Sequence, residues 1–319
     1  MAFPTNDECF ALSEEDLRTV SDRAGEILKE SERLKDARRY RRAVQKALRA
    51  ADLYEVVGNR FGRSRSLTLA GLFCIKAKHF RAAAYYMWKG LRVLEKQDYE
   101  KRAYFWGALA RIYRNLWSMD RAEKYYRIYL SLSMKEDNMI QVGYANVGLG
   151  LNYFQQGDYP KALKLTERAL GIFESLDQNA LIFLASGNLA CVYNKMGLHE
   201  ESLRLLTGIL ADKRLPDNAL YLCHTYHELA RTYLCLKDFD RYPMARDKAW
   251  EYATLSKDMV ELGRMTMLDA EWHASQGQQR KAMQSLRKAI VVFRNHGSPT
   301  DLIPAERLMM KWLKGGEHA

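Results

Sequence analysis

The chain has 319 residues, of which 48% are hydrophobic and 28% charged, and only six are proline. Proline this sparse in a chain rich in Ala, Leu, Arg, Lys and Glu favours a nearly all-helical fold, and no run approaches the roughly 18 apolar residues that a membrane span needs. The net charge of +11 is uneven, since residues 38–96 hold fifteen Lys and Arg against three Asp and Glu, which favours an anionic partner at that end.

The cysteines and the start of the chain bear on the cellular compartment. Five scattered cysteines without a CxxC pair exclude a disulfide framework and a common zinc motif. The opening residues, MAFPTNDECF, have neither the basic nor the apolar region of a secretory signal. We therefore expect a cytoplasmic protein with reduced thiols and no membrane partner.

Helices are expected along almost the whole chain after a flexible tail at residues 1–12. Ser13, followed by three acidic residues, is typical of a helix N-cap. The predicted helix pairs are 13–36/39–57, 60–76/79–97, 100–116/119–135, 139–156/159–175, 179–196/199–213, 217–236/239–256 and 259–276/279–295. These pairs would form one superhelix over 13–297, and residues 298–319 would add a capping helix and a tail, as open-ended stacks require.

The pairs repeat with a period of 40 residues. In the first helix of successive pairs an aromatic ring recurs at the same position, which we call the ring position: Tyr113, Tyr153, Tyr193 and Tyr233. Three residues before these and the neighbouring ring positions stand small residues: Ala70, Ala110, Gly150, Ala190, Ala230 and Ala270. The second helices keep the period with Ala82, Ala122, Ala162 and Ala282. Small residues let backbones approach closely and rings fill the space between hairpins, so the period predicts stacked helical hairpins.

One repeat carries a recognisable family pattern. Its residues are Leu149, Gly150, Tyr153, Gly157, Asp158, Tyr159, Ala162 and Ala169. With these residues, the chain resembles tetratricopeptide repeat (TPR) proteins over about residues 20–295, and its 40-residue period resembles the subgroup that includes bacterial peptide-sensing regulators. The resemblance implies an all-α fold: a right-handed α-solenoid of about seven TPR helical hairpins plus a C-terminal capping helix. It also implies that the concave groove binds a protein or peptide segment, in some relatives with regulation by a small ligand.

The groove is expected to be lined by the face of each first helix that lies opposite its buried stripe. The side chains predicted there are arginines, amides and exposed aromatics, which suit a peptide that is acidic in part. They are Tyr104, Arg111, Arg114, Asn115, Tyr144, Phe154, Gln155, Asn188, Asn194, Lys195, His227 and Arg231. The alternative is an ordinary solvated surface, since exposed polar residues are the norm.

A basic patch is predicted on the first two helix pairs. Its residues are Arg38, Arg39, Arg41, Arg42, Lys46, Arg49, Arg63 and Arg65. Such a patch would bind the phosphates of a nucleic acid with steep salt dependence, and an acidic protein surface would fit it equally well. No helix-turn-helix or base-stacking signature favours the nucleic acid. Three hypotheses therefore remain open: a scaffold for a protein segment, an anion binder and a peptide-sensing regulator.

Catalytic and metal-binding patterns are weak in this sequence. A nucleophile elbow, an HExxH motif and a Walker lysine are all missing from it. Cys223, His224, His227 and Glu228 could gather metal ligands on one helix face, but no second helix offers an obvious completing ligand. We expect a binding protein with no catalytic residue, metal or cofactor, and the sequence identifies neither its partner nor its oligomeric state.

Overall fold

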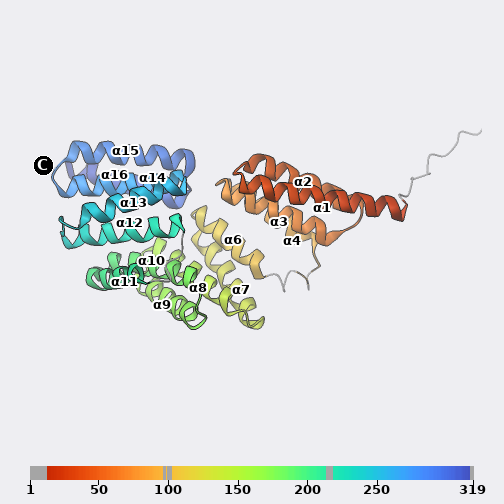
Figure 1. The fold of residues 1–319 in the computed structure, drawn as a ribbon, viewed down its shortest axis with the longest axis horizontal. Coiled ribbons are helices and arrows are strands. Elements are labelled where there is room, and N and C mark those ends of the chain that lie inside the picture. Colours follow the sequence, from red (N-terminus) through yellow and green to blue (C-terminus); the bar gives the residue numbers. More distant parts are fainter. Residues whose placement is uncertain (1–12, 96–97, 99–102, 213–217, 317–319) are drawn as a thin grey trace, which may run out of the picture. The chain divides into compact units, whose positions relative to one another are not determined.

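The computed structural model describes residues 13–95, 98, 103–212 and 218–316, and these residues form helices and connecting turns without any strand. Consecutive helices pair into the hairpins of an α-solenoid (Figure 1). The chain divides into two compact units, Met1–Glu100 and Lys101–Ala319. The predicted tail, residues 1–12, lies outside the described residues, and a single superhelix over 13–297 stays a prediction.

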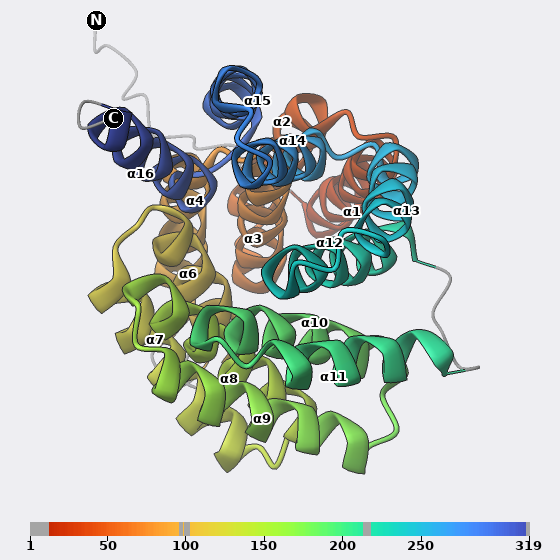
Figure 2. The ribbon, with the colours of Figure 1, turned by 90° about the vertical axis from the view of Figure 1, so that its left-hand side faces the viewer.

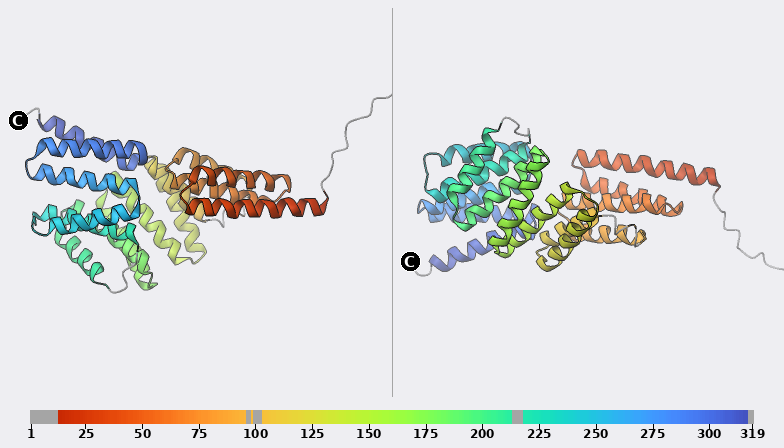
Figure 3. Two further views of the ribbon diagram at one scale, coloured as in Figure 1. Left: turned by 45° about the horizontal axis from the view of Figure 1, so that its top comes forward. Right: turned by 90° about the horizontal axis from the view of Figure 1, so that it is seen from below.

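Unit 1 consists of two hairpins. Their helices are α1 (Glu14–Asp36), α2 (Tyr40–Val56), α3 (Arg60–Lys76) and α4 (Phe80–Val93), and they run alongside one another (Figure 3). Ser13 is the N-cap of α1, as the sequence predicted, and it forms a reciprocal capping box with Asp16. The core between the hairpins contains Ala47 and Phe73, whose side chains are buried.

Unit 2 consists of five hairpins and one further helix. The hairpins are α6 (Ala103–Asn115)/α7 (Met119–Lys135), α8 (Met139–Gln156)/α9 (Tyr159–Ser175), α10 (Asn179–Met196)/α11 (His199–Ala211), α12 (Ala219–Leu236)/α13 (Tyr242–Ser256) and α14 (Met259–Ser275)/α15 (Gln279–His296). The further helix is α16 (Pro299–Gly316). Figure 2 shows α10 and α12 on the inner side of the curved stack, with α11 and α13 outside them.

The predicted repeat is the packing pattern of the structure. All six small residues of the first helices are buried, from Ala70 to Ala270. Helices α7 and α8 also approach closely at Gly148, where a Cβ atom would lie 2.1 Å from the ring of Tyr126. One predicted position is wrong: Ala82 is half-buried, and its neighbour Ala83 is fully buried in its place. The buried face of α4 is therefore shifted by one residue relative to the 40-residue period of the second helices in unit 2.

Turn residues end the helices where the sequence predicted. Gly157 and Gly197 follow α8 and α10 with φ of 86° and 79°, a left-handed conformation that favours glycine. Asp158 then accepts a hydrogen bond from the backbone N–H of Lys161 and caps α9. Pro243 lies in the first turn of α13, which begins at Tyr242, three residues later than the period alone would place it.

Helix α16 packs against the last hairpin. Its Leu302, Leu308 and Trp312 pack on the cluster that contains Ile290 and Phe293 of α15. An apolar hairpin end is thereby covered, which removes the exposed surface that an unfinished stack would present. None of the described helices combines the length and the apolar character needed to cross a bilayer.

The core of unit 2 offers a direct stability test. Leu206 of α11 is 0% exposed, whereas Leu255 of α13 is 59% exposed. We expect Leu206→Ala to lower the free energy of unfolding by about 2–5 kcal/mol, because it removes buried methyl groups and leaves a cavity. The same change at Leu255 should cost less than about 0.5 kcal/mol. Urea unfolding followed by circular dichroism checks both, and equal losses would contradict the packing described here.

Candidate functional site

The inner surface of unit 2 encloses a cavity of about 400 Å³. The first helices α6, α8, α10, α12 and α14 supply most of its wall, and α15 and α16 complete it. This volume lies near the lower end of the range for small-ligand sites. The cavity can therefore enclose a few residues of an extended chain or a small molecule.

One part of the wall is apolar. Its residues are Leu151, Phe154, Phe183, Leu184, Leu220 and Met267. Helices α10 and α12 come close together because Gly187 has no side chain, and a Cβ atom there would lie 2.7 Å from Nδ1 of His224. The close approach brings His224 of α12 against the backbone of α10.

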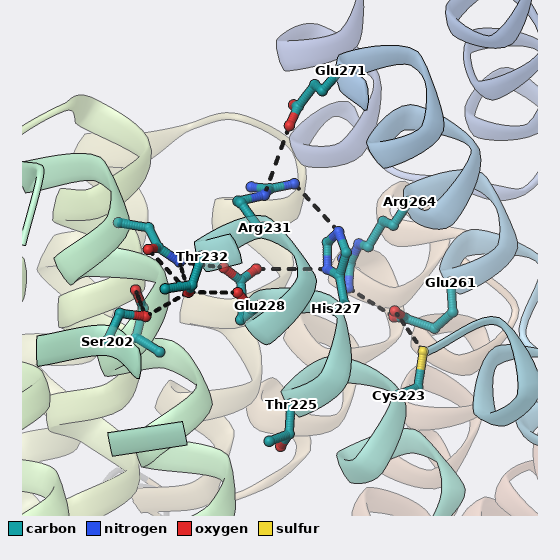
Figure 4. Close-up of polar contacts among 12 residues, drawn as sticks. Ser202, Cys223, Thr225, His227, Glu228, Arg231, Thr232, Glu261, Arg264 and Glu271 are labelled. Carbon is teal, nitrogen blue, oxygen red and sulfur yellow. Dashed lines mark hydrogen bonds and ion pairs between the residues drawn. The ribbon is translucent and has the colours of Figure 1, made fainter. Parts of the chain in front are cut away.

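The polar part of the wall is centred on α12. His227 and Glu228 stand four and three residues before Arg231, about one helical turn, so both side chains lie beside that of Arg231 (Figure 4). Nδ1 of His227 lies 3.6 Å from Oε1 of Glu228, and its Nε2 lies 3.3 Å from Nη2 of Arg231. Nε of Arg231 lies 4.0 Å from Oε2 of Glu271 on α14. Arg231 thus connects α12 electrostatically to the neighbouring first helix, α14.

Burial and neighbouring charges set the protonation of this cluster. Burial, together with the positive charge of Arg231, lowers the pKa of His227 to about 3, so the imidazole is neutral at physiological pH. Burial alone would raise the pKa of Glu228, but the positive charge of Arg231, together with a hydrogen bond from Asn194, outweighs it and lowers that pKa. Glu228 is therefore an ionised carboxylate although it is only 2% exposed.

A hydrogen-bonded group joins α10, α11 and α12 beside Glu228 (Figure 4). Nδ2 of Asn194 donates to Oγ1 of Thr232 at 3.0 Å and to Oε2 of Glu228 at 3.4 Å. The hydroxyls of Ser202 and Thr232 lie 2.9 Å apart. Because these buried groups satisfy one another, they hold three helices in one arrangement.

Helix α16 closes the cavity on the remaining side. Arg264 of α14 pairs with Glu261 at 2.7 Å and with Asp301 of α16 at 2.8 Å. The hydroxyl of Thr300 donates to Oδ1 of Asn115 on α6 at 3.4 Å, a contact between residues 185 positions apart. The first and last helices of unit 2 therefore meet around the cavity.

Several polar atoms in the wall have no hydrogen-bond partner among the described residues. They are Nε of Arg114, Oε1 of Gln155 and Nδ2 of Asn188, all shielded from solvent. Asn188 as a whole is only 8% exposed. Leaving a buried donor or acceptor unpaired costs about 1–3 kcal/mol. These three residues line one cavity, and their guanidinium and amide groups suit a ligand that offers both C=O and N–H groups, or a carboxylate.

The cluster is poorly suited to acid–base or nucleophilic chemistry. Burial, with a contribution from Glu228, raises the pKa of the Cys191 thiol to about 12, which leaves no thiolate at neutral pH. The neutral His227 is held between Glu228 and Arg231. In the described part of the chain, no group of three His, Cys, Asp or Glu side chains is placed to hold a metal ion.

The structure brings many of the predicted groove residues together. Those that line the cavity are Arg114, Asn115, Phe154, Gln155, Asn188, His227 and Arg231. Asn194 and Lys195 line an adjoining cavity of about 300 Å³ that shares Arg231. Tyr104, Arg111 and Tyr144 line neither cavity, and the two tyrosines are each 40% exposed. The binding roles of all twelve stay predictions.

Other lining residues were not among the predicted set. Arg264, Met267 and Glu271 occupy the same repeat positions as His224, His227 and Arg231, so the 40-residue spacing applied to the last hairpin would have found them. Thr300, Asp301 and Pro304 belong to α16, which lies outside the repeat. No periodic signal could have placed these three in the wall.

The predicted basic patch lies in unit 1 and is separate from this cavity. Lys46 pairs with Glu30 at 2.7 Å, and Arg63 pairs with Glu55 at 2.6 Å. Arg38 lies in the α1–α2 turn with φ of 55°. The remaining members are all exposed: Arg39, Arg41, Arg42, Arg49 and Arg65. The patch is thus smaller in effective charge than the sequence suggests.

Comparisons with known proteins give a family match and similar folds. Residues 141–211 match the tetratricopeptide repeat model. The fold is similar to that of the quorum sensor NprR from B. thuringiensis, with TM-score 0.64 and 15% identity over 95% of this chain and 89% of that chain. It is also similar to a Rap conjugation gene regulator of plasmid pLS20 in complex with a Phr peptide, with TM-score 0.63 and 13% identity over 93% and 95%.

A third similar structure is aspartyl phosphate phosphatase F from Bacillus subtilis, with TM-score 0.58 and 11% identity over 95% of this chain and 94% of that chain. Identities this low describe a shared fold. A search of curated proteins found no match to the chain.

Proposed function

We propose that this chain, whose residues 141–211 match the tetratricopeptide repeat model, binds a short peptide, or an extended segment of a protein, inside the cavity of unit 2. The observation that carries this proposal is the cavity wall itself, where apolar side chains stand beside Arg114, Gln155 and Asn188, each with one buried atom that has no partner among the described residues. A peptide backbone supplies acceptors and donors for the polar groups of these side chains. The apolar wall beside them would take the ligand's side chains.

The charges around the cavity favour a ligand that carries a carboxylate. Arg264 and Arg231 are engaged by Glu261, Asp301 and Glu271. Arg114, by contrast, has its Nε without a partner among the described residues. A guanidinium with an unused donor pairs best with a carboxylate, often in a bidentate geometry. We therefore infer a ligand that is acidic in part, with an acidic side chain or a C-terminal carboxylate near Arg114.

Regulation by a peptide is the finer version of this proposal. Similar folds include a quorum sensor and a gene regulator in complex with a peptide. A ligand enclosed by α6, α8, α10, α12, α14 and α16 would stabilise the closed arrangement of these helices by mass action. The proposed role is that of a binding and regulatory protein without catalysis, and the cytoplasmic location stays a prediction.

Selection from a random peptide display library, using the whole chain as the target, tests the proposal. We expect enrichment of short peptides with an acidic group and apolar side chains. A synthetic copy should bind in calorimetry and slow amide hydrogen exchange in the inner helices α8, α10 and α12 more than in α9 and α11. Failure to enrich any peptide, or protection confined to unit 1 or to the outer helices, would remove the cavity as the binding site.

A further inference from the structure

The outward face of α2 is basic along its length. Ala43, Ala47 and Ala50 form the buried stripe of this helix. On the opposite face Arg41, Arg42 and Arg49 are exposed, with Asp52 as the single acidic neighbour on that face. Arg41 and Arg49 lie eight residues apart, which is about 12 Å along the helix axis, since each residue rises about 1.5 Å. The exposed arginines thus distribute positive charge along this face.

Helix α4 repeats this arrangement 40 residues later. Ala83, Met87 and Gly90 are its buried stripe. Its exposed face carries Arg81, Lys89 and Arg92, with Tyr85 between the first two. Arg81 and Lys89 stand one period after Arg41 and Arg49, so successive second helices of unit 1 present equivalent cations. We call these exposed side chains, Arg41, Arg42, Arg49, Arg81, Lys89 and Arg92, the basic face.

The basic face has few acidic neighbours on α2, α3 and α4, and most other acidic residues of unit 1 lie on α1. Between residues 38 and 95 the acidic residues are Asp52, Glu55 and Glu95. Glu55 pairs with Arg63 and Glu95 pairs with Arg60, so two of the three carboxylates are held elsewhere. No residue of the basic face forms an ion pair with any described residue. A concentrated positive potential of this kind attracts a polyanion.

The composition of the face favours nucleic acid over an acidic protein. Protein–protein interfaces have an apolar core surrounded by a polar rim, whereas this face has no apolar centre. Interfaces with nucleic acid are more polar and far more positive. The one aromatic residue on the face, Tyr85, is 60% exposed between Arg81 and Lys89. An exposed ring between cations is the arrangement on which a base of a single strand stacks while its phosphates are neutralised.

We propose that the basic face of unit 1 binds single-stranded nucleic acid, with the cations on phosphates and the Tyr85 ring on a base. The site is independent of the peptide cavity, because every residue that carries it belongs to α2 or α4. Binding would not depend on sequence, since phosphate contacts and stacking carry little base information.

Fluorescence anisotropy with a labelled single-stranded oligonucleotide of about 20 nucleotides tests the proposal on the full chain. The double variant Arg81→Glu/Lys89→Glu should weaken binding at least about tenfold at about 50 mM salt. It should also reduce the slope of log K against log salt concentration by about 1.4, because each of the two lost phosphate contacts contributes about 0.7. Arg41→Glu/Arg49→Glu should act likewise. Tyr85→Ala should weaken binding by about tenfold without changing the salt slope, because it removes stacking and no charge.

The matched control is Lys164→Glu/Arg168→Glu on the exposed face of α9 in unit 2. It alters net charge by the same amount and should leave binding within about twofold of the wild type. Equal weakening by the control would show that only overall charge matters and would overturn the assignment. Tighter binding of a labelled polyglutamate of equal length than of the oligonucleotide would overturn it in favour of an acidic protein. Circular dichroism confirms that each variant is folded.

Discussion

Replacing Cys191 by tryptophan is expected to abolish binding of the peptides selected on the wild-type chain. Cys191 lies on α10 in the wall of the cavity, and an indole there would project into a space of about 400 Å³ and take up part of it. The ligand would then lose the room for its side chains and its access to Asn188. We expect the Kd measured by calorimetry to rise at least about 100-fold, which corresponds to about 2.7 kcal/mol.

Thr207→Trp is the matched control, since Thr207 is exposed on the outer helix α11. This variant adds the same indole outside the cavity and should bind as the wild type does. A second variant covers the case in which Cys191→Trp does not fold. Arg114→Met removes a guanidinium from the cavity wall and should weaken binding of an acidic peptide by about tenfold or more, whereas Arg168→Met on α9 should not. Unchanged peptide affinity in both Cys191→Trp and Arg114→Met would contradict the proposed site.

Replacing Arg264 by methionine should destabilise unit 2 and release α16. The side chain of Arg264 is 38% exposed, but its partners Glu261 and Asp301 have side chains that are only 8% and 6% exposed. Removing the arginine leaves two neighbouring carboxylates buried without their cation, which is the costly way to break an ion pair. We expect a loss of about 2–4 kcal/mol at neutral pH, reduced from the fully buried value because solvent screens the arginine.

The loss should shrink as the pH falls. Burial by itself would raise the pKa of Asp301, but Arg264 and hydrogen bonds from Ser298 outweigh it and lower that pKa. A carboxyl whose folded pKa lies below its unfolded value of about 3.9 stabilises the fold above that value, and the contribution is lost as the pH falls through the folded pKa. The difference between wild type and Arg264→Met should therefore be largest near neutral pH and smallest well below pH 4.

Thermal unfolding and hydrogen exchange in α16 between neutral pH and about pH 3 check this expectation. Arg294→Met is the control, because Arg294 also reaches α16, through Glu306, but both side chains are well exposed at 62% and 41%. It should cost less than about 1 kcal/mol. A loss of equal size in the two variants, or one that does not change with pH, would contradict the role given to the Arg264 pairs.

The two variants probe different properties of the same wall. Cys191→Trp acts on the space that a ligand needs, while Arg264→Met acts on the helix that closes this space through Asp301. A ligand held between α6 and α16 should offset part of the loss in the second variant, since binding stabilises the closed form. Comparing the thermal shift with and without a selected peptide measures that coupling.

The sequence by itself determined the helices, their pairing and the faces they bury. Small residues such as Ala110 and Gly150 recur every 40 positions because each hairpin packs against its neighbour in the same way. Each repeat therefore contains its own copy of the residues that this packing requires. Turn residues such as Gly157 marked the helix ends because the left-handed conformation is a local requirement. The groove-facing positions followed from the same period, which is why Asn188 and His227 could be predicted to face inward.

Only the tertiary structure decided how these faces combine into a site. The curvature of the stack accumulates from small rotations between hairpins, and no single repeat reveals whether the last helix will return to the first. The curvature brings α16 back to α6 and α14, where Thr300 contacts Asn115 and Asp301 pairs with Arg264. Which polar atoms find partners also depends on these distant contacts, so the unpaired donors of Arg114 and Asn188 could not be read from the period.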